Sequence, residues 1–209
     1  SVIRPVKSEA KSIQKAIALV KKYNTAFHVA HLTSKRGLEF VTKAKAEGLP
    51  VTCEVAPHHL LLSTNDYKEL GTLCKMNPPV RGVADNEALW QALEEGAVDC
   101  VASDHAPHTL AEKQEGRPLD APSGVPGVET SLPILLNRLK PERIYKLMFE
   151  NPNRIFGLGK EDIVEGSKAD IVIVDATVKK EIHAADLHGM CRWTPFEGRE
   201  VRGEVTRVV

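Results

Sequence analysis

Three short apolar runs that end in acidic or imidazole side chains constrain the fold of this chain most strongly. The runs are residues 26–31, 51–59 and 98–102, and the side chains at or just beyond their ends are His31, His58, His59 and Asp104. Helical stretches separate the runs, which gives the strand, helix, strand alternation of a parallel sheet. In a (β/α)8 TIM barrel the strand ends converge on one mouth, where catalytic groups gather. The sequence therefore predicts an α/β fold that contains part of such a barrel.

Hydrophobic periodicity and turn residues predict the other elements. The expected segments are helices over 8–22, 34–48, 85–96, 129–139 and 141–149, a loop over 114–127, a turn and a buried strand over 166–175, and short strands near Val201 and Val205. Asp85 is the candidate N-cap of its helix. The change of pattern near residue 158 indicates two parts. Residues 1–158 would be the barrel part and residues 159–209 part of a small β subdomain.

The length of the chain limits how much of a barrel it can form. A complete barrel needs roughly 250 residues, whereas the chain has 209 and only three runs suited to barrel strands. We therefore expect the C-terminal portion of a larger enzyme, with the last three strands and their helices. Alone it should neither close a barrel nor catalyse a reaction, so a complementary N-terminal half is an expected partner.

Charge and cysteine usage exclude several classes of protein. The chain has 28 basic and 28 acidic side chains, which argues against a nucleic-acid surface. No apolar run is long enough to span a membrane, and the first residues do not resemble a signal peptide. The four cysteines form no CxxC pair, so neither a disulfide framework nor a thiolate zinc site is indicated. We expect a cytoplasmic enzyme that acts on a small molecule.

His31 and Asp104 are the first candidates for metal ligands, because a neutral imidazole and a carboxylate both suit Zn²⁺. Two ligands leave a catalytic zinc ion under-coordinated, so further ligands must lie outside this chain. Other roles remain open at this point, because His31 could be a half-buried structural histidine and Asp104 could cap a turn. We interpret His58 and His59 as structural or supporting residues, since neighbours at a strand end diverge.

A set of motifs gives the chain a family resemblance. The motifs are residues 28–31, 53–59, 76–81, 103–109, 126–130, 151–156 and 193–198. Together they resemble the type I dihydroorotases of the amidohydrolase superfamily, over nearly the whole chain. Singly, only the segment around Asp104 is specific.

The resemblance implies a barrel with a binuclear zinc site, of which this chain holds His31 and Asp104 as metal ligands. It also implies a catalytic role for Asp104, which would accept a proton from the attacking water and deliver it to the ring nitrogen. The family's substrate-binding positions match four residues of this sequence: Asn77, His108, Ser123 and Gly124. The other zinc ligands would lie outside this chain.

The implied reaction is the reversible cyclisation of N-carbamoyl-L-aspartate to L-dihydroorotate in pyrimidine biosynthesis, by a protein that we expect to form a homo-oligomer. A hydantoinase or an allantoinase would share the barrel and the metals, although Asn77 and residues 104–109 favour dihydroorotate. The alternative from another class is a non-catalytic subunit that scaffolds aspartate transcarbamoylase. The retained His31 and Asp104 argue against it.

Overall fold

A short parallel sheet forms the centre of the structure, a computed structural model that describes residues 3–209. Its strands are β1 (Phe27–Val29), β2 (Val51–Val55) and β3 (Cys100–Val101), in the order β1-β2-β3. All neighbours are parallel, with Phe27 opposite Val51 and Glu54 opposite Cys100. Each strand lies within one of the three predicted runs. The strand and helix alternation expected from the sequence is therefore present.

Side chains alternate between the two faces of this sheet, as they do along any strand. Val29, Cys53 and Val55 are buried in the main hydrophobic core. The residues between them point to the opposite face, which is polar and carries His28, Thr52, Glu54 and Cys100. The sheet therefore has one face for packing and one face for polar groups.

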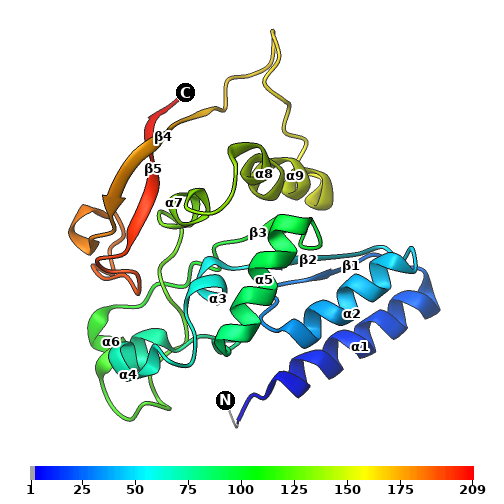
Figure 1. Cartoon of the computed structure of the whole chain (residues 1–209), viewed down its shortest axis with the longest axis horizontal. Helices are drawn as coiled ribbons and strands as arrows, with labels where there is room; N and C mark the ends of the chain where they lie inside the picture. The colour runs from blue at the N-terminus through cyan, green and yellow to red at the C-terminus, as the bar shows by residue number, and fades with distance from the viewer. Residues whose placement is uncertain (1–2) are drawn as a thin grey trace.

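Long helices pack against the apolar face. They are α1 (Val6–Tyr23), α2 (Lys35–Ala46) and α5 (Val83–Glu95). Figure 1 shows α1 and α2 side by side, and α2 also contacts α5. Ile13 and Val20 of α1, Val41 of α2 and Leu93 of α5 are buried in the shared core. Their spacing is the helical periodicity from which these helices were predicted.

Two local predictions were wrong in detail. The helix expected from Asp85 begins at Val83 with Gly82 as its N-cap, and Asp85 instead accepts a hydrogen bond from the Lys35 backbone N–H at 2.9 Å. The run 51–59 is a strand only as far as Val55, because Pro57 begins the short helix α3 (Pro57–Leu61), in which proline occupies a first-turn position. His58 and His59 thus lie on a helix.

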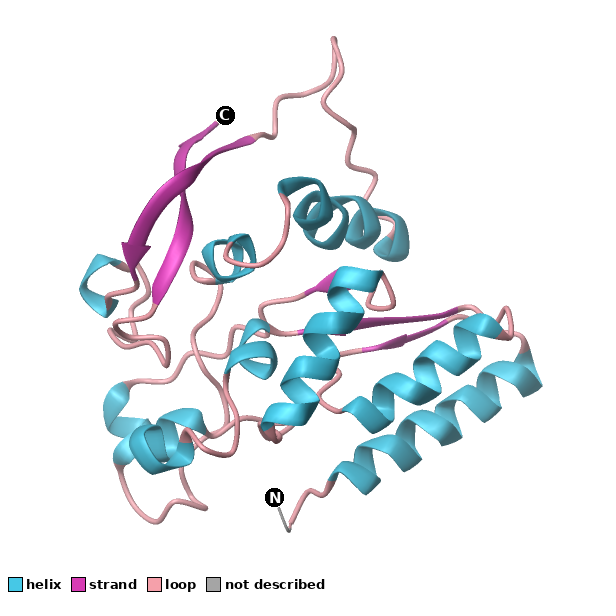
Figure 2. Cartoon of the chain, in the orientation of Figure 1, coloured by secondary structure: helices cyan, strands magenta, loops and turns pink. Residues whose placement is uncertain are grey.

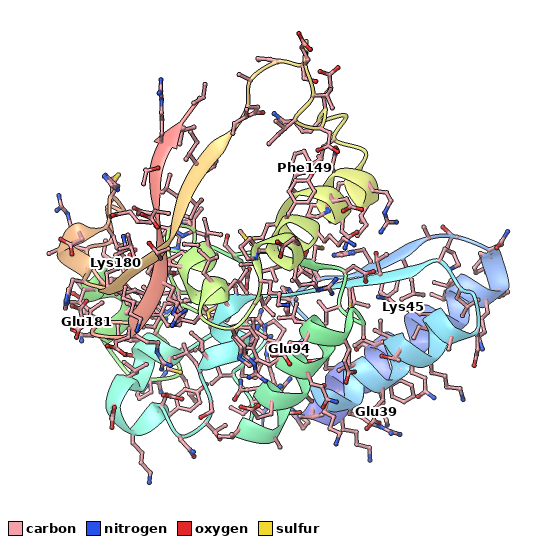
Figure 3. The ribbon with its side chains drawn as sticks, turned by 45° about the horizontal axis from the view of Figure 1, so that its top comes forward. Glu39, Lys45, Glu94, Phe149, Lys180 and Glu181 are labelled. Atoms are coloured by element: carbon pink, nitrogen blue, oxygen red, sulfur yellow. The ribbon has the colours of Figure 1, made fainter. Side chains whose placement is uncertain are left out.

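The start of β3 is tied to its neighbours by one carboxylate. Asp99 Oδ2 accepts hydrogen bonds from the Cys53 backbone N–H at 2.7 Å and from Lys45 of α2. Figure 3 shows Lys45 on α2 beside the sheet. Polar contacts thus fix the strand order at the end of the sheet opposite to Asp104.

Short helices and loops occupy most of the rest of the chain, as Figure 2 shows. They are α4 (Tyr67–Leu70), η1 (Gly71–Cys74), α6 (Leu110–Gln114), α7 (Ser131–Leu136), α8 (Pro141–Tyr145), the π-helical η2 (Lys146–Glu150), α9 (Asn151–Phe156) and η3 (Ala184–Asp186). The helix expected over 141–149 continues through η2 and α9. Most of the predicted loop over 114–127 is irregular, and it begins where α6 ends.

An antiparallel ribbon ends the chain. It pairs β4 (Val172–Glu181) with β5 (Glu200–Val208), and Lys180 lies opposite Val201. Figure 1 shows the ribbon apart from the parallel sheet, on the side where α7 contacts β5. A second core cluster, which includes Ile134 and Val201, joins the two parts. The division at residues 158 and 159 stays a prediction. No helix among residues 3–209 has the length and apolar character that crossing a membrane requires.

Candidate active site

The two predicted metal ligands share an unusual backbone conformation. His31 follows β1 and Asp104 follows β3, and their φ angles are +36° and +45°. Positive φ is uncommon for residues other than glycine, and such conformations concentrate at functional sites. Both residues lie at the carboxyl-terminal edge of the parallel sheet. The strands therefore bring them to the same edge, as the sequence predicted.

Glu54 holds the turn at His31. Its Oε1 accepts a hydrogen bond from the His31 backbone N–H at 3.3 Å, and its Oε2 lies 3.1 Å from His28 Nε2. His28 Nδ1 in turn lies 2.7 Å from Thr52 Oγ1. Burial raises the pKa of Glu54, but the hydrogen bonds from His28 and the His31 N–H outweigh burial, and the net pKa is lowered. A carboxylate on β2 thus supports the metal-ligand candidate in the turn after β1.

His58 brings a third polar atom to this edge. Its Nε2 lies 3.7 Å from Asp104 Oδ2, and the His58 side chain is almost completely buried. Burial, followed by the neighbouring His59 and His31, lowers the pKa of His58 well below its usual value. Burial raises the pKa of Asp104, the charge of His31 lowers it, and that of Glu54 raises it further. The site therefore contains a neutral imidazole beside a desolvated carboxyl group.

Three buried atoms at this edge have no hydrogen-bond partner among the described residues. They are His31 Nδ1, His58 Nε2 and Asp104 Oδ2; His59 Nδ1, in the residue next to His58, is a fourth buried atom without a partner among the described residues. Buried polar atoms in folded proteins almost always have a partner. Neutral imidazole nitrogens and a carboxylate oxygen are ligands that zinc accepts. The atoms left unpaired at this edge therefore fit a bound cation.

His59 has a different role from its neighbour. Its Nε2 lies 3.0 Å from the carbonyl oxygen of Pro78, and its own carbonyl accepts a hydrogen bond from Asn86 Nδ2 at 2.6 Å. Burial lowers the pKa of His59 to about 4. His59 is thus a neutral histidine held by backbone contacts, which agrees with the structural or supporting role expected for both members of this pair. His58 differs, because its Nε2 lies 3.7 Å from Asp104 Oδ2.

Sequence reasoning missed a second group of possible metal ligands. Within the described part of the chain, His28, Glu54 and Cys100 have ligand atoms that all lie within 4.8 Å of one another. Burial raises the pKa of the Cys100 thiol to about 12, and Glu54 is already engaged by His28 and His31. The alternation of residues along three aligned strands is the signal that places them together.

Two of the predicted substrate-binding residues share an open cleft. Asn77 and Ser123 line a cavity of about 680 Å³, together with residues that include Arg4 and Lys75. Arg4 donates a hydrogen bond to Asn77 Oδ1. No local pattern in the sequence indicated that Asn77 and Ser123 would line the same cleft.

Gly124 follows Ser123 in a position that only glycine fits. Its φ is +146°, and a Cβ atom built on it would lie 2.3 Å from the carbonyl oxygen of Ala106. The Gly124 N–H donates to the Lys75 carbonyl at 3.0 Å. The loop over 114–127 is therefore packed tightly against the segment that follows Asp104.

The two histidines after Asp104 are distinguished by their contacts. His105 Nδ1 accepts hydrogen bonds from the backbone N–H groups of Gly127 at 3.1 Å and Val128 at 3.3 Å. His105 thus shapes the following loop. His108 is half-buried, and its carbonyl oxygen accepts a hydrogen bond from Trp193 Nε1 at 2.7 Å. His105 is thus held through its side chain, and His108 through its backbone carbonyl.

Known proteins resemble the chain throughout its length. The sequence model of the Amidohydrolase family matches residues 3–209. A dihydroorotase of Halobacterium salinarum is 43% identical over 204 residues, which is 95% of this chain and 47% of the relative. A dihydroorotase of Deinococcus radiodurans is 37% identical over 203 residues, or 95% of this chain and 49% of the relative. The chain spans about half the length of the curated relatives it matches.

Solved structures share the fold of nearly the whole chain. An L-hydantoinase (dihydropyrimidinase) from Arthrobacter aurescens superposes with a TM-score of 0.92 at 33% identity, covering 98% of this chain and 48% of that one. A dihydropyrimidinase from Brevibacillus agri NCHU1002 has a TM-score of 0.93 at 27% identity, with coverage of 99% and 48%. The predicted fold, a portion of an amidohydrolase-type barrel with α/β architecture, is confirmed.

Proposed function

Because the chain belongs to the amidohydrolase family, we propose that it supplies the last three barrel strands and part of the active site of a dihydroorotase. The observation that carries the proposal is the position of His31 and Asp104, both with positive φ, at one edge of the parallel sheet. The identity of 43% to a dihydroorotase supports this substrate over other cyclic amides. The remaining metal ligands would come from a complementary N-terminal half of the barrel.

The proposed reaction interconverts N-carbamoyl-L-aspartate and L-dihydroorotate. Ring closure forms an amide bond between nitrogen and a carboxyl carbon and releases one water molecule, and hydrolysis reverses it. The proposed metal is zinc, about two ions per complete site, which when bound lowers the pKa of water and polarises the amide carbonyl. His31 Nδ1 and Asp104 Oδ2 are the atoms of this chain that would hold it.

Asp104 would move the proton in the hydrolytic direction. Its Oδ2 is buried, has no hydrogen-bond partner among residues 3–209, and lies 3.7 Å from His58 Nε2. A carboxylate so placed can accept a proton from water and return it to the leaving ring nitrogen.

The other predicted residues would bind and orient the substrate. His108 would pair with a substrate carboxylate, and Asn77, Ser123 and Gly124 would contact the ring. Asn77 and Ser123 line one cleft of about 680 Å³, which supports a shared ligand. These contacts would contribute orientation, because a fixed geometry lowers the barrier of a reaction between bound groups.

A hydantoinase is the second candidate function. It is favoured by the structural similarity to the Arthrobacter aurescens enzyme, with a TM-score of 0.92. The Arthrobacter aurescens enzyme is 33% identical to this chain, whereas the Halobacterium salinarum dihydroorotase is 43% identical. This difference favours dihydroorotate as the substrate. An allantoinase would share the same metal chemistry.

The test is turnover of dihydroorotate, hydantoin and allantoin, measured side by side with the complete barrel that contains this chain. Zinc content is measured on the same protein. We expect turnover of dihydroorotate with about two zinc ions per site. Preferred turnover of hydantoin or allantoin would reassign the substrate. Absence of both zinc and turnover would support a scaffold for aspartate transcarbamoylase.

We expect a cytoplasmic homo-oligomer of the complete protein that acts on a small molecule, and this chain alone should be inactive. Size-exclusion chromatography with light scattering measures the oligomeric state. Turnover by this chain without a complementary half would contradict the expected division of the active site.

A further inference from the structure

Lys113 is buried although it lies on a short helix between exposed loops. Its side chain has no exposed surface, and it is among the largest fully buried side chains of the described residues. Lysine is almost never fully buried unless its charge is paired. The surroundings of this ammonium group therefore need an explanation.

Backbone carbonyls surround the Lys113 ammonium. Its Nζ donates hydrogen bonds to the carbonyl oxygens of Lys75 at 3.1 Å, Pro122 at 3.0 Å and Gly124 at 2.9 Å. An ammonium group has three N–H donors, so each one has an acceptor. The Gly124 N–H also donates to the Lys75 carbonyl at 3.0 Å. Two distant segments of the chain are thus joined at one buried charge.

Both segments carry proposed substrate contacts. Lys75 lies two positions before Asn77, and Pro122 and Gly124 flank Ser123. Asn77 and Ser123 face the same cleft. The Lys113 ammonium is therefore hydrogen-bonded to both backbone segments on which the distance between Asn77 and Ser123 depends.

Trp193 extends this arrangement to the third substrate-binding segment. The Lys113 Nζ lies 5.7 Å from the centre of the Trp193 ring, within range of a cation–π interaction. Trp193 Nε1 donates to the carbonyl oxygen of His108 at 2.7 Å. One lysine and one tryptophan thus connect the backbones of all three segments.

We propose that Lys113 is a positioning residue that fixes the substrate-binding loop of residues 122–124 against the segment that carries Asn77. The proposal rests on the proposed function, because it concerns the same cleft. A neutral side chain at position 113 would remove this donor from three carbonyls. The Lys75 carbonyl would keep the Gly124 N–H as a partner, and leaving the other two carbonyls unpaired is costly. The loop would then move away from the Asn77 segment and widen the cleft.

Lys75 offers a matched comparison. Its Nζ donates to the carbonyls of Leu119 at 2.6 Å, Ala121 at 2.5 Å and Pro118 at 3.3 Å. These carbonyls belong to the outer part of the same loop, farther along the chain from Ser123. Its side chain is less buried than that of Lys113. Loss of this ammonium should loosen the outer loop and leave residues 122–124 in place.

The first measurement is amide hydrogen exchange of the protein carrying Lys113→Met, which replaces the ammonium with an uncharged side chain of similar length. We expect the Gly124 amide to exchange at least about tenfold faster than in the parent, because its segment loses hydrogen bonds. The amides of α5 serve as an internal reference and should not change. Lys75→Met is the control and should leave Gly124 exchange within about twofold.

The second measurement is the kinetics of dihydroorotate hydrolysis by the complete barrel with the same variants. For Lys113→Met we expect KM to rise about tenfold and kcat to change less than about threefold, because His31 and Asp104 are held by other elements. Lys113→Gln, which keeps two N–H donors, should fall between the parent and Lys113→Met in both measurements. It also provides the comparison if Lys113→Met does not fold.

The outcomes separate the two proposals. Faster Gly124 exchange in a protein that does not hydrolyse dihydroorotate would support the role of Lys113 in the loop and refute the proposed substrate. Unchanged Gly124 exchange in Lys113→Met or Lys113→Gln would overturn the role of Lys113, whatever the enzyme activity. A loss of kcat with unchanged KM would also overturn it.

Discussion

His31 and Asp104 follow different strands of one sheet, yet both have the positive φ that is rare outside glycine, +36° and +45°. Each residue turns the chain as its strand ends. The side chains of two residues in such turns can leave the sheet edge and meet a common ligand. Backbone strain of this kind persists only where surrounding contacts enforce it, and Glu54 provides such a contact at His31.

Replacement of Asp104 should separate activity from folding. For Asp104→Asn we expect the turnover of dihydroorotate to fall at least about 100-fold, because the amide cannot carry the proton. The fold should remain, since Oδ2 of the parent carboxylate makes no hydrogen bond with the described residues. Turnover and circular dichroism are measured on the same preparation. Near-normal activity would refute the role given to Asp104.

Replacement of His108 should act on substrate affinity. For His108→Ala we expect KM to rise about tenfold or more, with a smaller change in kcat, because the side chain would orient a carboxylate without taking part in bond changes. His105→Ala is the informative comparison. Its Nδ1 accepts two backbone hydrogen bonds, so that variant should lower the thermal stability as well. Equal KM values for the parent and His108→Ala would exclude this contact.

Replacement of Glu54 should weaken metal binding through His31. Glu54→Ala removes the acceptor of the His31 N–H, and loss of groups that orient a metal ligand typically costs 10- to 100-fold in affinity. We expect about a tenfold loss of zinc affinity, measured by competition with a chelating dye. Glu54→Gln retains a carbonyl acceptor and should lose less.

The same titration distinguishes the two possible metal sites. If zinc binds at His31 and Asp104, Cys100→Ala should leave the zinc affinity unchanged. If the group formed by His28, Glu54 and Cys100 holds the metal, Cys100→Ala should lower the affinity and His31→Ala should not. The second pattern would refute the proposed site.

The sequence could predict the strand ends because they depend on local patterns. An apolar run followed by Asp104 or His31 indicates a strand that delivers a polar group to the sheet edge. The role of Glu54 was not predictable in this way, because it depends on the register that places β2 beside β1. The contacts of Lys113 with Lys75 and Gly124 likewise join segments that no periodicity connects.

The helix that contains His58 shows a second reason why the sequence alone could not predict the whole site. The run 51–59 suits a strand throughout, but Pro57 begins α3 and turns His58 toward Asp104. Proline favours the first turn of a helix, and this signal competed with a continuous apolar pattern. The tertiary contact between His58 and Asp104 could be found only in the folded chain.

Acid should destabilise the protein through its buried histidines. Burial lowers the pKa of His59 to about 4 and that of His58 well below its usual value. Unfolded histidine has a pKa near 6.5, so between these values the unfolded state binds more protons. The free energy of unfolding is therefore at its full value above about pH 6.5 and decreases as the pH falls toward 4.

The measurement is urea unfolding at a series of pH values between about 6.5 and 4.5, with a chelator present so that metal binding does not contribute. Each buried histidine should contribute a slope of up to about 1.4 kcal/mol per pH unit. His59→Gln retains a side-chain donor for the Pro78 carbonyl and does not titrate, so it should reduce the slope by about that amount. A slope unchanged by His59→Gln would mean that the pKa of His59 is not lowered in the folded protein, contrary to the effect of its burial.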